Sequence, residues 1–356
     1  MAPNPPRIVD LDHWAFHLRG APRQSLCVAA AGDGALTLVD VDSGQARSVA
    51  GLPKIRDIYP HPSRRLLAVI DNGAGKLSVV DFDSSRLLEQ EAPRFGKRVP
   101  SWQRPGFDGC FFDPNGNYLW SAARLSRNAV EVQLRETERW SVVGSVAVKD
   151  PFEESSCSFH ATSEPNVAAL WLAGGQDGQR VYWVTKHADS LGVEPEPFLE
   201  DTTPPVFALK KNEFLVIDGL WSVCKYPFPP DRKLGTCRSK WGEEDYFGDC
   251  LCYLDDTIAL VHSHHGRLFR IDLRAMKIRE EMTVRGHEPR PVEEYYPTLV
   301  GDKTLCTDIA YFARFGEIVV LGYHREAGTE VGQWKDTLMF YDVDSIARKT
   351  ASSEGH

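Results

Sequence analysis

The sequence has no apolar run that approaches the roughly 20 residues a membrane-spanning helix needs. Its longer apolar runs, such as 66–70 and 318–321, end within a few positions in charge or glycine. It also has no long run of lysine or arginine, and its formal net charge of −9 is spread over many short patches. The sequence therefore lacks the clustered basic residues that an extended phosphate-binding surface needs. We therefore expect a protein that binds neither a membrane nor nucleic acid.

The first residues, Met-Ala-Pro-Asn-Pro-Pro-Arg, lack the basic start, apolar middle and small-residue cleavage site of a secretory signal. The expectation is a cytoplasmic protein. Cysteine is also sparse, with 8 in 356 residues, which is far from the density of a disulfide scaffold. Most cysteines stand in apolar runs, as at 25–29 and 108–112, where a free thiol acts as a small core hydrophobe.

A metal site has little support in the sequence. Cys250 and Cys252, with His262 and His264 further along, contain suitable ligand atoms. No second cysteine pair follows at the spacing of a zinc site, so we predict no metal and no cofactor. Several enzyme signatures are missing too, namely the Gly-x-Ser-x-Gly elbow, His-Glu-x-x-His, the phosphate-binding Gly-x-x-x-x-Gly-Lys and a dinucleotide fingerprint. Catalysis is not excluded, because an enzyme can assemble its residues from distant parts of the chain.

The sequence does contain a repeated unit of short apolar runs and turns. The segment 107–120 aligns without a gap to 247–260, and each has two strand-like runs around a turn. A third run, which often ends in aspartate, and a weaker fourth run follow each pair. Four strands repeated seven times, with a period of about 40 to 50 residues, predict an all-β, seven-bladed β-propeller. The same frame fits 13–29, 56–69, 157–170, 204–217 and 307–320.

The two ends of the chain predict how the ring closes. The last repeat has a good third run at 338–342 but little after it, whereas Arg-Ile-Val-Asp-Leu at 7–11 precedes the first repeat. We predict that this N-terminal segment is the outer strand of the seventh blade. The expected organisation is one propeller over 1–350 and a flexible C-terminal tail over 351–356.

With these repeats the chain resembles the seven-bladed WD40-like and quinoprotein amine dehydrogenase-like propeller superfamily over essentially its full length. The WD dipeptide is absent, and its place is taken by Val39-Asp40, Val80-Asp81, Ile271-Asp272 and Tyr341-Asp342. The resemblance implies a divergent propeller. The resemblance alone also suggests one possible function, that of a structural accessory subunit of an oxidoreductase complex.

Long loops gather on one rim of the predicted ring. In a four-stranded blade, the loops between strands two and three share a rim with the loops that join one blade to the next. The longest loops of this chain join one blade to the next (92–107, 149–156, 239–246 and 285–304). A rigid scaffold with long loops on one side usually binds there. Our leading hypothesis is a non-catalytic, monomeric scaffold that binds a basic or neutral protein or peptide partner on this rim. The predicted binding residues are Trp102, Arg104, Arg124, Trp241, Asp245, Tyr295, Tyr296 and Arg325.

The alternative is a propeller enzyme of the lactonase, hydrolase or amine-oxidising type, with its site at the central axis on the same rim. Histidines beside a turn are more often solvated than catalytic, and acidic runs are usually solvated faces, so the identity of the catalytic residues stays open. The candidates are His264, His265, His324, Glu243 and Glu244.

Overall fold

A computed structural model gives the architecture of the chain. It describes residues 7–12, 15, 17–21, 24, 26–30, 34–49, 52, 54–71, 75–84, 86–91, 106–152, 155–162, 164, 166–174, 179–188, 190–194, 207–210, 213–218, 222–227, 233–238, 247–253, 257–263, 267–283, 303–312, 317–325 and 335–342. In these ranges no helix has the length and apolar character to cross a membrane.

The described strands form seven four-stranded antiparallel sheets. Blade 1 contains β2 (His17–Ala21), β3 (Leu26–Ala30), β4 (Leu36–Asp40) and β5 (Ala46–Val49). Blade 2 contains β6 (Ile55–Pro60), β7 (Leu66–Asp71), β8 (Leu77–Asp81) and β9 (Arg86–Glu91). Blade 3 contains β10 (Phe107–Phe112), β11 (Tyr118–Ser126), β12 (Ala129–Glu136) and β13 (Val142–Lys149). Blade 4 contains β14 (Ser156–Ala161), β15 (Val167–Ala173), β16 (Gln179–Lys186) and β17 (Leu191–Val193).

The second half of the chain continues the pattern. Blade 5 contains β18 (Phe207–Lys210), β19 (Glu213–Asp218), β20 (Ser222–Pro227) and β21 (Gly235–Arg238). Blade 6 contains β22 (Phe247–Tyr253), β23 (Ile258–Ser263), β24 (Arg267–Asp272) and β25 (Lys277–Thr283). Blade 7 contains β26 (Lys303–Phe312), β27 (Glu317–Arg325), β28 (Lys335–Asp342) and the N-terminal β1 (Arg7–Asp10).

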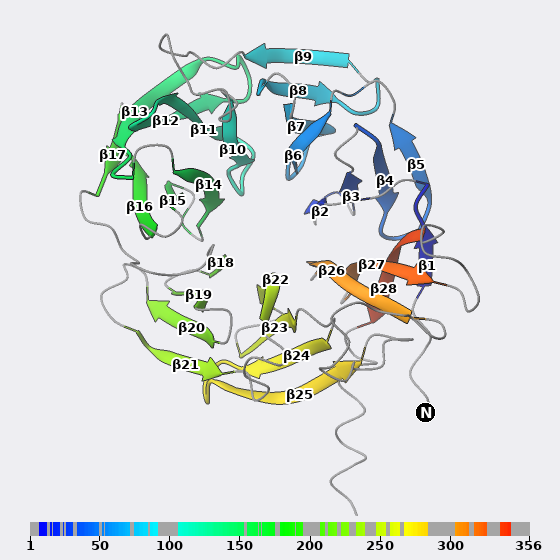
Figure 1. The fold of residues 1–356 in the computed structure, drawn as a ribbon. Helices are drawn as coiled ribbons and strands as arrows, with labels where there is room; N and C mark the ends of the chain where they lie inside the picture. Colours follow the sequence, from blue (N-terminus) through cyan, green and yellow to red (C-terminus); the bar gives the residue numbers. More distant parts are fainter. Residues whose placement is uncertain are drawn as a thin grey trace, which may run out of the picture.

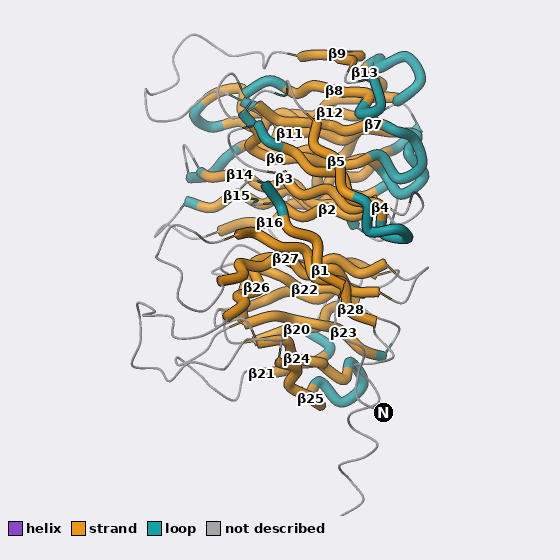
Figure 2. Tube along the Cα trace, turned by 90° about the vertical axis from the view of Figure 1, so that its right-hand side faces the viewer, coloured by secondary structure: helices purple, strands orange, loops and turns teal. Residues whose placement is uncertain are grey.

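The blades stand in a ring, with the first strand of each blade toward the centre and the fourth toward the outside (Figure 1). Figure 2 shows the same ring from the side, with the strands crossing its thickness and the turns on its two faces. The predicted all-β propeller of four-stranded antiparallel blades is therefore confirmed.

The ring closes as predicted. Strand β1 pairs antiparallel with β28, with Arg7 opposite Phe340 and Asp10 opposite Thr337. The Arg7 guanidinium lies over the Phe340 ring, and it donates hydrogen bonds to the carbonyl oxygens of Val41 and Asp42 in blade 1. One side chain of the closing strand thus joins the last blade to the first.

The hydrophobic core lies between neighbouring blades rather than within one sheet. Trp120 of blade 3 and Phe159 of blade 4, for example, belong to one buried cluster, with their ring centroids 6.3 Å apart. Because both faces of such a sheet are covered, its inner strands can be apolar at consecutive positions, as the burial of every residue from Leu66 to Ile70 shows. The core interpretation of the cysteines is confirmed at four positions, where free thiols are buried: Cys110, Cys157, Cys224 and Cys237.

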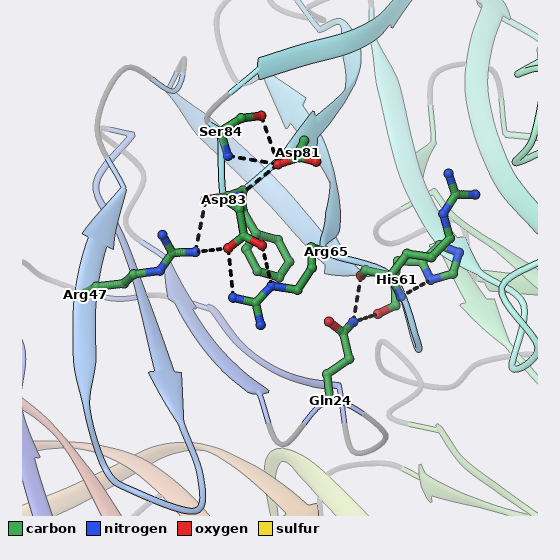
Figure 3. A network of polar contacts seen from close by, with 9 residues as sticks. Gln24, Arg47, His61, Arg65, Asp81, Asp83 and Ser84 are labelled. Atoms are coloured by element: carbon green, nitrogen blue, oxygen red, sulfur yellow. Dashed lines mark hydrogen bonds and ion pairs between the residues drawn. The ribbon is translucent and has the colours of Figure 1, made fainter.

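The aspartates that end the third strands organise the turns after them. Asp81 Oδ1 accepts hydrogen bonds from the backbone N–H groups of Asp83 and Ser84, at 3.0 and 2.9 Å (Figure 3). Asp40 Oδ1 accepts hydrogen bonds from the backbone N–H and the hydroxyl of Ser43, and the hydrogen bonds in the two turns lower the pKa of both carboxyls. The residue that stands in place of the WD aspartate is therefore an Asx-turn cap, which favours the tight connection to the outer strand.

Candidate functional site

A cavity of about 520 Å³ lies at the centre of the ring, between blades 1 to 4. Its walls come from the innermost strands β2, β6, β10 and β14, which carry polar side chains beside the aromatic rings of Phe111, Phe112 and Phe159. Among the described strands, each of these has a hydrogen-bonded neighbour on only one side. Their free edges present backbone N–H and C=O groups toward the centre. We call this space the axial cavity.

One polar cluster joins blades 1 and 2 across the wall of the axial cavity. Arg19 Nη2 lies 3.4 Å from Asp57 Oδ1, and the Tyr59 hydroxyl donates to Asp57 Oδ2 at 2.9 Å. Asp57 Oδ1 also accepts the backbone N–H of Ile58 at 2.8 Å. Burial, and next the charge of Asp57, raise the pKa of Tyr59 well above its usual value, so this hydroxyl is a proton donor at neutral pH.

A second ion pair joins blades 2 and 3. Arg56 Nη2 lies 3.1 Å from Asp108 Oδ1, and both residues are the ones skipped by β-bulges, which occur in the same part of β6 and β10. Asp108 Oδ2 is buried and has no hydrogen-bond partner in the described part of the chain. Burial raises the pKa of this carboxyl, and the charges of Arg56 and Arg124 oppose the rise.

A third polar pair comes from blade 4. Ser158 Oγ lies 2.8 Å from His160 Nε2, and both residues line the axial cavity. They are two positions apart on β14, so their side chains point to the same face of the strand. Burial lowers the pKa of His160 to about 4, although the charge of Asp57 acts in the opposite direction. The imidazole is therefore neutral at pH 7.

A second cavity, of about 610 Å³, lies between blades 3 and 4 beside the predicted inter-blade loop 149–156. Lys149 and Pro151 border it from blade 3, and Arg180 and Tyr182 from blade 4. The Arg180 guanidinium lies 5.9 Å from the centroid of Phe152, so the loop is held against the neighbouring blade.

Arg124, predicted as a binding residue, has only 6% of its surface exposed. Its Nη1 lies 2.8 Å from Asp150 Oδ2, and its Nη2 donates to the carbonyl oxygen and the hydroxyl of Ser155, at 2.5 and 3.2 Å. Asp150 follows the last strand of blade 3 and Ser155 precedes the first strand of blade 4. The guanidinium thus has a structural role in the connection between blades, and its predicted contact with a partner stays a prediction.

Of the other predicted site residues, the structure describes only His324 and Arg325. His324 and Arg325 belong to β27, where they pair with Thr304 and Lys303 of β26. The ladder of β27 with β28 also includes His324, which pairs with Lys335, so His324 lies in a strand and not in a loop of the rim. The remaining predicted residues lie outside the described ranges, as does the tail 351–356: Trp102, Arg104, Trp241, Glu243, Glu244, Asp245, His264, His265, Tyr295 and Tyr296.

None of the residues that line the axial cavity was among the predicted site residues. A signal for them exists, since polar residues stand inside the apolar first runs of four successive repeats. These positions are Arg19, Asp57, Asp108, Ser158 and His160. A polar residue in an otherwise apolar inner strand is costly to bury, so it indicates a partner or a cavity beside it.

Comparisons with known proteins show the fold. No protein-family model matches the sequence, and no curated protein matches it. Solved structures match in large number, 1514 chains in all. One of them is the β-propeller domain of Cps50 (Swd1) from Myceliophteria thermophila, with a TM-score of 0.61 and 10% sequence identity over 95% of this chain and 100% of that chain. At this identity the likeness extends to the β-propeller fold and to nothing finer.

Proposed function

We propose that this protein is a propeller scaffold that binds a protein or peptide partner, with an extended segment of the partner entering the axial cavity. The observation that carries the proposal is the axial cavity itself, whose walls are four strands with free edges. Unpaired strand edges offer alternating donors and acceptors, which are the groups that a peptide backbone binds. The volume is in the range of ligand sites in proteins, roughly 300 to 1,000 Å³.

The charges around the cavity favour a neutral or basic ligand over an anion. Two of the three carboxylates that line it have an arginine partner, Arg19 for Asp57 and Arg56 for Asp108, and the third, Asp113, accepts the backbone N–H groups of Asn115 and Tyr118. These two pairs contribute no net charge. The buried Asp108 Oδ2 still lacks a donor within the described ranges, and a backbone amide N–H would supply one without adding a charge.

The proposal includes the surface around the cavity. The cavity extends along β6 and β10 from Asp57 and Asp108, near the rim of the inter-blade loops, to Pro62 and Pro114 in the turns of the opposite face. A partner held by the long-loop rim would contact the predicted residues Trp241 and Tyr295 before its segment reached the axis. We further propose a WD40-like, cytoplasmic monomer that does not bind nucleic acid, consistent with the net charge of −9.

A peptide selection tests the proposal. The full-length protein, immobilised, is used to enrich short random peptides, and the affinity of each enriched peptide is measured by calorimetry. The proposal predicts weaker binding to the rim variant Trp241→Ala/Tyr295→Ala and to the axial variant Tyr59→Phe, which loses only a hydroxyl. The control variant Leu87→Ala/Leu88→Ala changes exposed residues of the outer strand β9 and keeps full affinity.

Two outcomes count against the proposal. If no peptide is enriched above a bare support, the axial cavity is not a peptide site. If enriched peptides lose affinity only for the outer-strand variant, the binding surface is the outer wall and not the axis or the rim. Capture of partners from an extract of the native organism, compared between the wild-type protein and the rim variant, extends the test to whole proteins.

A further inference from the structure

Ser158 and His160 are in the relative position of a nucleophile and its base. The hydroxyl oxygen and the ring nitrogen are 2.8 Å apart, within the range at which a base removes a proton. In the tautomer with the ring proton on Nδ1, the serine hydroxyl donates to Nε2. Serine is a weak nucleophile on its own, and an imidazole that accepts its proton is the usual means of activating it.

We propose that Ser158 and His160 form a catalytic pair that hydrolyses small, uncharged carboxylic esters in the axial cavity, an activity distinct from partner binding. Both residues line the cavity, and their side chains share one face of β14, so a substrate in the cavity can contact both. The apolar part of the wall, from Phe111, Phe112 and Phe159, suits a short acyl chain. The two ion pairs contribute no net charge, and Asp113, which also lines the cavity, would repel an anionic substrate.

The reaction takes place in two steps and needs only water as a second reactant. In the first, Ser158 Oγ adds to the ester carbonyl carbon while its proton passes to His160 Nε2. The C–O bond to the alcohol then breaks, and the alcohol leaves with that proton. In the second, His160 takes a proton from water, the hydroxide adds to the acyl-serine carbonyl, and Ser158 leaves with the proton as the acid is released. The imidazole ends neutral, as it began.

The surroundings of His160 keep it in the form that accepts a proton. Asp57 from β6 favours the protonated ring, while burial and Arg19 from β2 favour the neutral ring and prevail. The free edges of β10 and β14 present backbone N–H groups toward the same cavity, where a carbonyl oxygen gains charge during the addition. A base with so low a pKa is weak, so we expect a slow hydrolase.

The test uses the full-length protein and two probes. A fluorophosphonate should attach to Ser158, located by intact mass and peptide mapping, and p-nitrophenyl butyrate should be hydrolysed faster than in buffer. Ser158→Ala should abolish both, and His160→Gln should slow hydrolysis about 100-fold. The matched control Ser145→Ala changes an exposed serine of β13 and should leave both unchanged. Between pH 5.5 and 8 the rate should be flat, since His160 is already neutral there.

Folding is checked on every variant by its melting temperature. The variant Ser158→Cys keeps a nucleophile, so a thiol-reactive ester should label position 158 in that variant. The proposal is overturned if the wild-type protein is not labelled, or if Ser158→Ala and His160→Gln hydrolyse the ester at the wild-type rate. The rim variant Trp241→Ala/Tyr295→Ala separates the two proposals, because it should weaken peptide binding and still hydrolyse the ester at the wild-type rate.

Discussion

His61 and Gly116 connect blades 2 and 3 through a hydrogen bond of 2.9 Å between His61 Nε2 and the Gly116 carbonyl oxygen. His61 Nδ1 accepts the backbone N–H groups of Ser63 and Arg64, so the ring proton is on Nε2 and is donated to Gly116. Gln24 of blade 1 donates to the His61 carbonyl oxygen, as Figure 3 shows. One turn of blade 2 is thus bonded to turns of both neighbouring blades.

Replacement of Gly116 should be among the most costly single changes in this region. Its φ of 76° lies in the left-handed region, and an added Cβ would lie 2.2 Å from His61 Cε1. Left-handed strain costs about 1–2 kcal/mol and overpacking about 1–3 kcal/mol more. Gly116→Ala should therefore lower the free energy of unfolding, measured in urea, by about 2–5 kcal/mol. Gly44→Ala is the control, because its φ is 70° but its Cβ would meet only the flexible Arg7 side chain, at 3.1 Å. Equal losses in the two variants would contradict the crowding argument.

Acid should destabilise the protein through its buried histidines. Burial lowers the pKa of His61 from 6.5 to about 4, so between these values the unfolded chain binds a proton that the folded protein does not. The contribution of His61 is therefore complete above pH 6.5, falls as the pH is lowered toward 4, and changes no further below that. The expected slope is up to about 1.4 kcal/mol per pH unit for one proton. Urea unfolding from pH 4.5 to 7.5 should show a shallower slope for His61→Gln and an unchanged slope for His187→Gln, whose histidine is exposed. A slope that is the same in all three proteins would rule His61 out as a source of acid sensitivity.

The sequence predicts the blades because each strand and turn is determined by nearby residues. Asp113, Asn115 and Gly116 form a turn through local hydrogen bonds, which any copy of the repeat can form by itself. The closing strand was predictable for a related reason, since 7–11 contains the strand-forming residues Ile8, Val9 and Leu11 and the last repeat lacks a fourth run. These local features fix the number and the order of the strands.

The axial cavity depends on residues far apart in the chain. Arg19 and Asp57 are separated by 38 positions, and Arg56 and Asp108 by 52. The β-bulges at Arg56 and Asp108 shift the register of the inner strands, so simple alternation does not indicate which side chains meet. The burial of Arg124 was not predictable for a similar reason, since its partners Asp150 and Ser155 are 26 and 31 positions away in the chain.

The buried pair of Arg124 and Asp150 should contribute more to stability than exposed pairs do. Asp150 has none of its side chain exposed and also accepts hydrogen bonds from the backbone and hydroxyl of Ser155. Arg124→Ala leaves this carboxylate without its cation, and breaking a buried pair typically costs about 3–5 kcal/mol. A double-mutant cycle with Asp150→Ala measures the coupling.

The control for that cycle is the pair formed by Arg65 and Asp83, visible in Figure 3, in which both side chains are about half exposed. Exposed pairs couple by about 0–1 kcal/mol. Similar coupling energies for the two pairs would mean that burial does not set the strength of the Arg124 contact. The comparison uses urea unfolding at pH 7, where both carboxylates are ionised, since hydrogen bonds lower the pKa of each.

Ring closure by β1 should govern the stability of the whole propeller. Removal of residues 1–11 would expose the edge of β28 and take away Leu11, which packs with Val39 of blade 1 and Leu338 of blade 7. Because the blades are held mainly by contacts with their neighbours, an opened ring should melt at a lower temperature as a whole. Arg7→Ala removes the bonds to Val41 and Asp42 and the contact with the Phe340 ring, and it should lower the melting temperature by a few degrees. Arg86→Ala, at an exposed position of β9, is the control and should melt like the wild-type protein. A truncated chain with an unchanged melting curve would show that the N-terminal strand does not hold the ring closed.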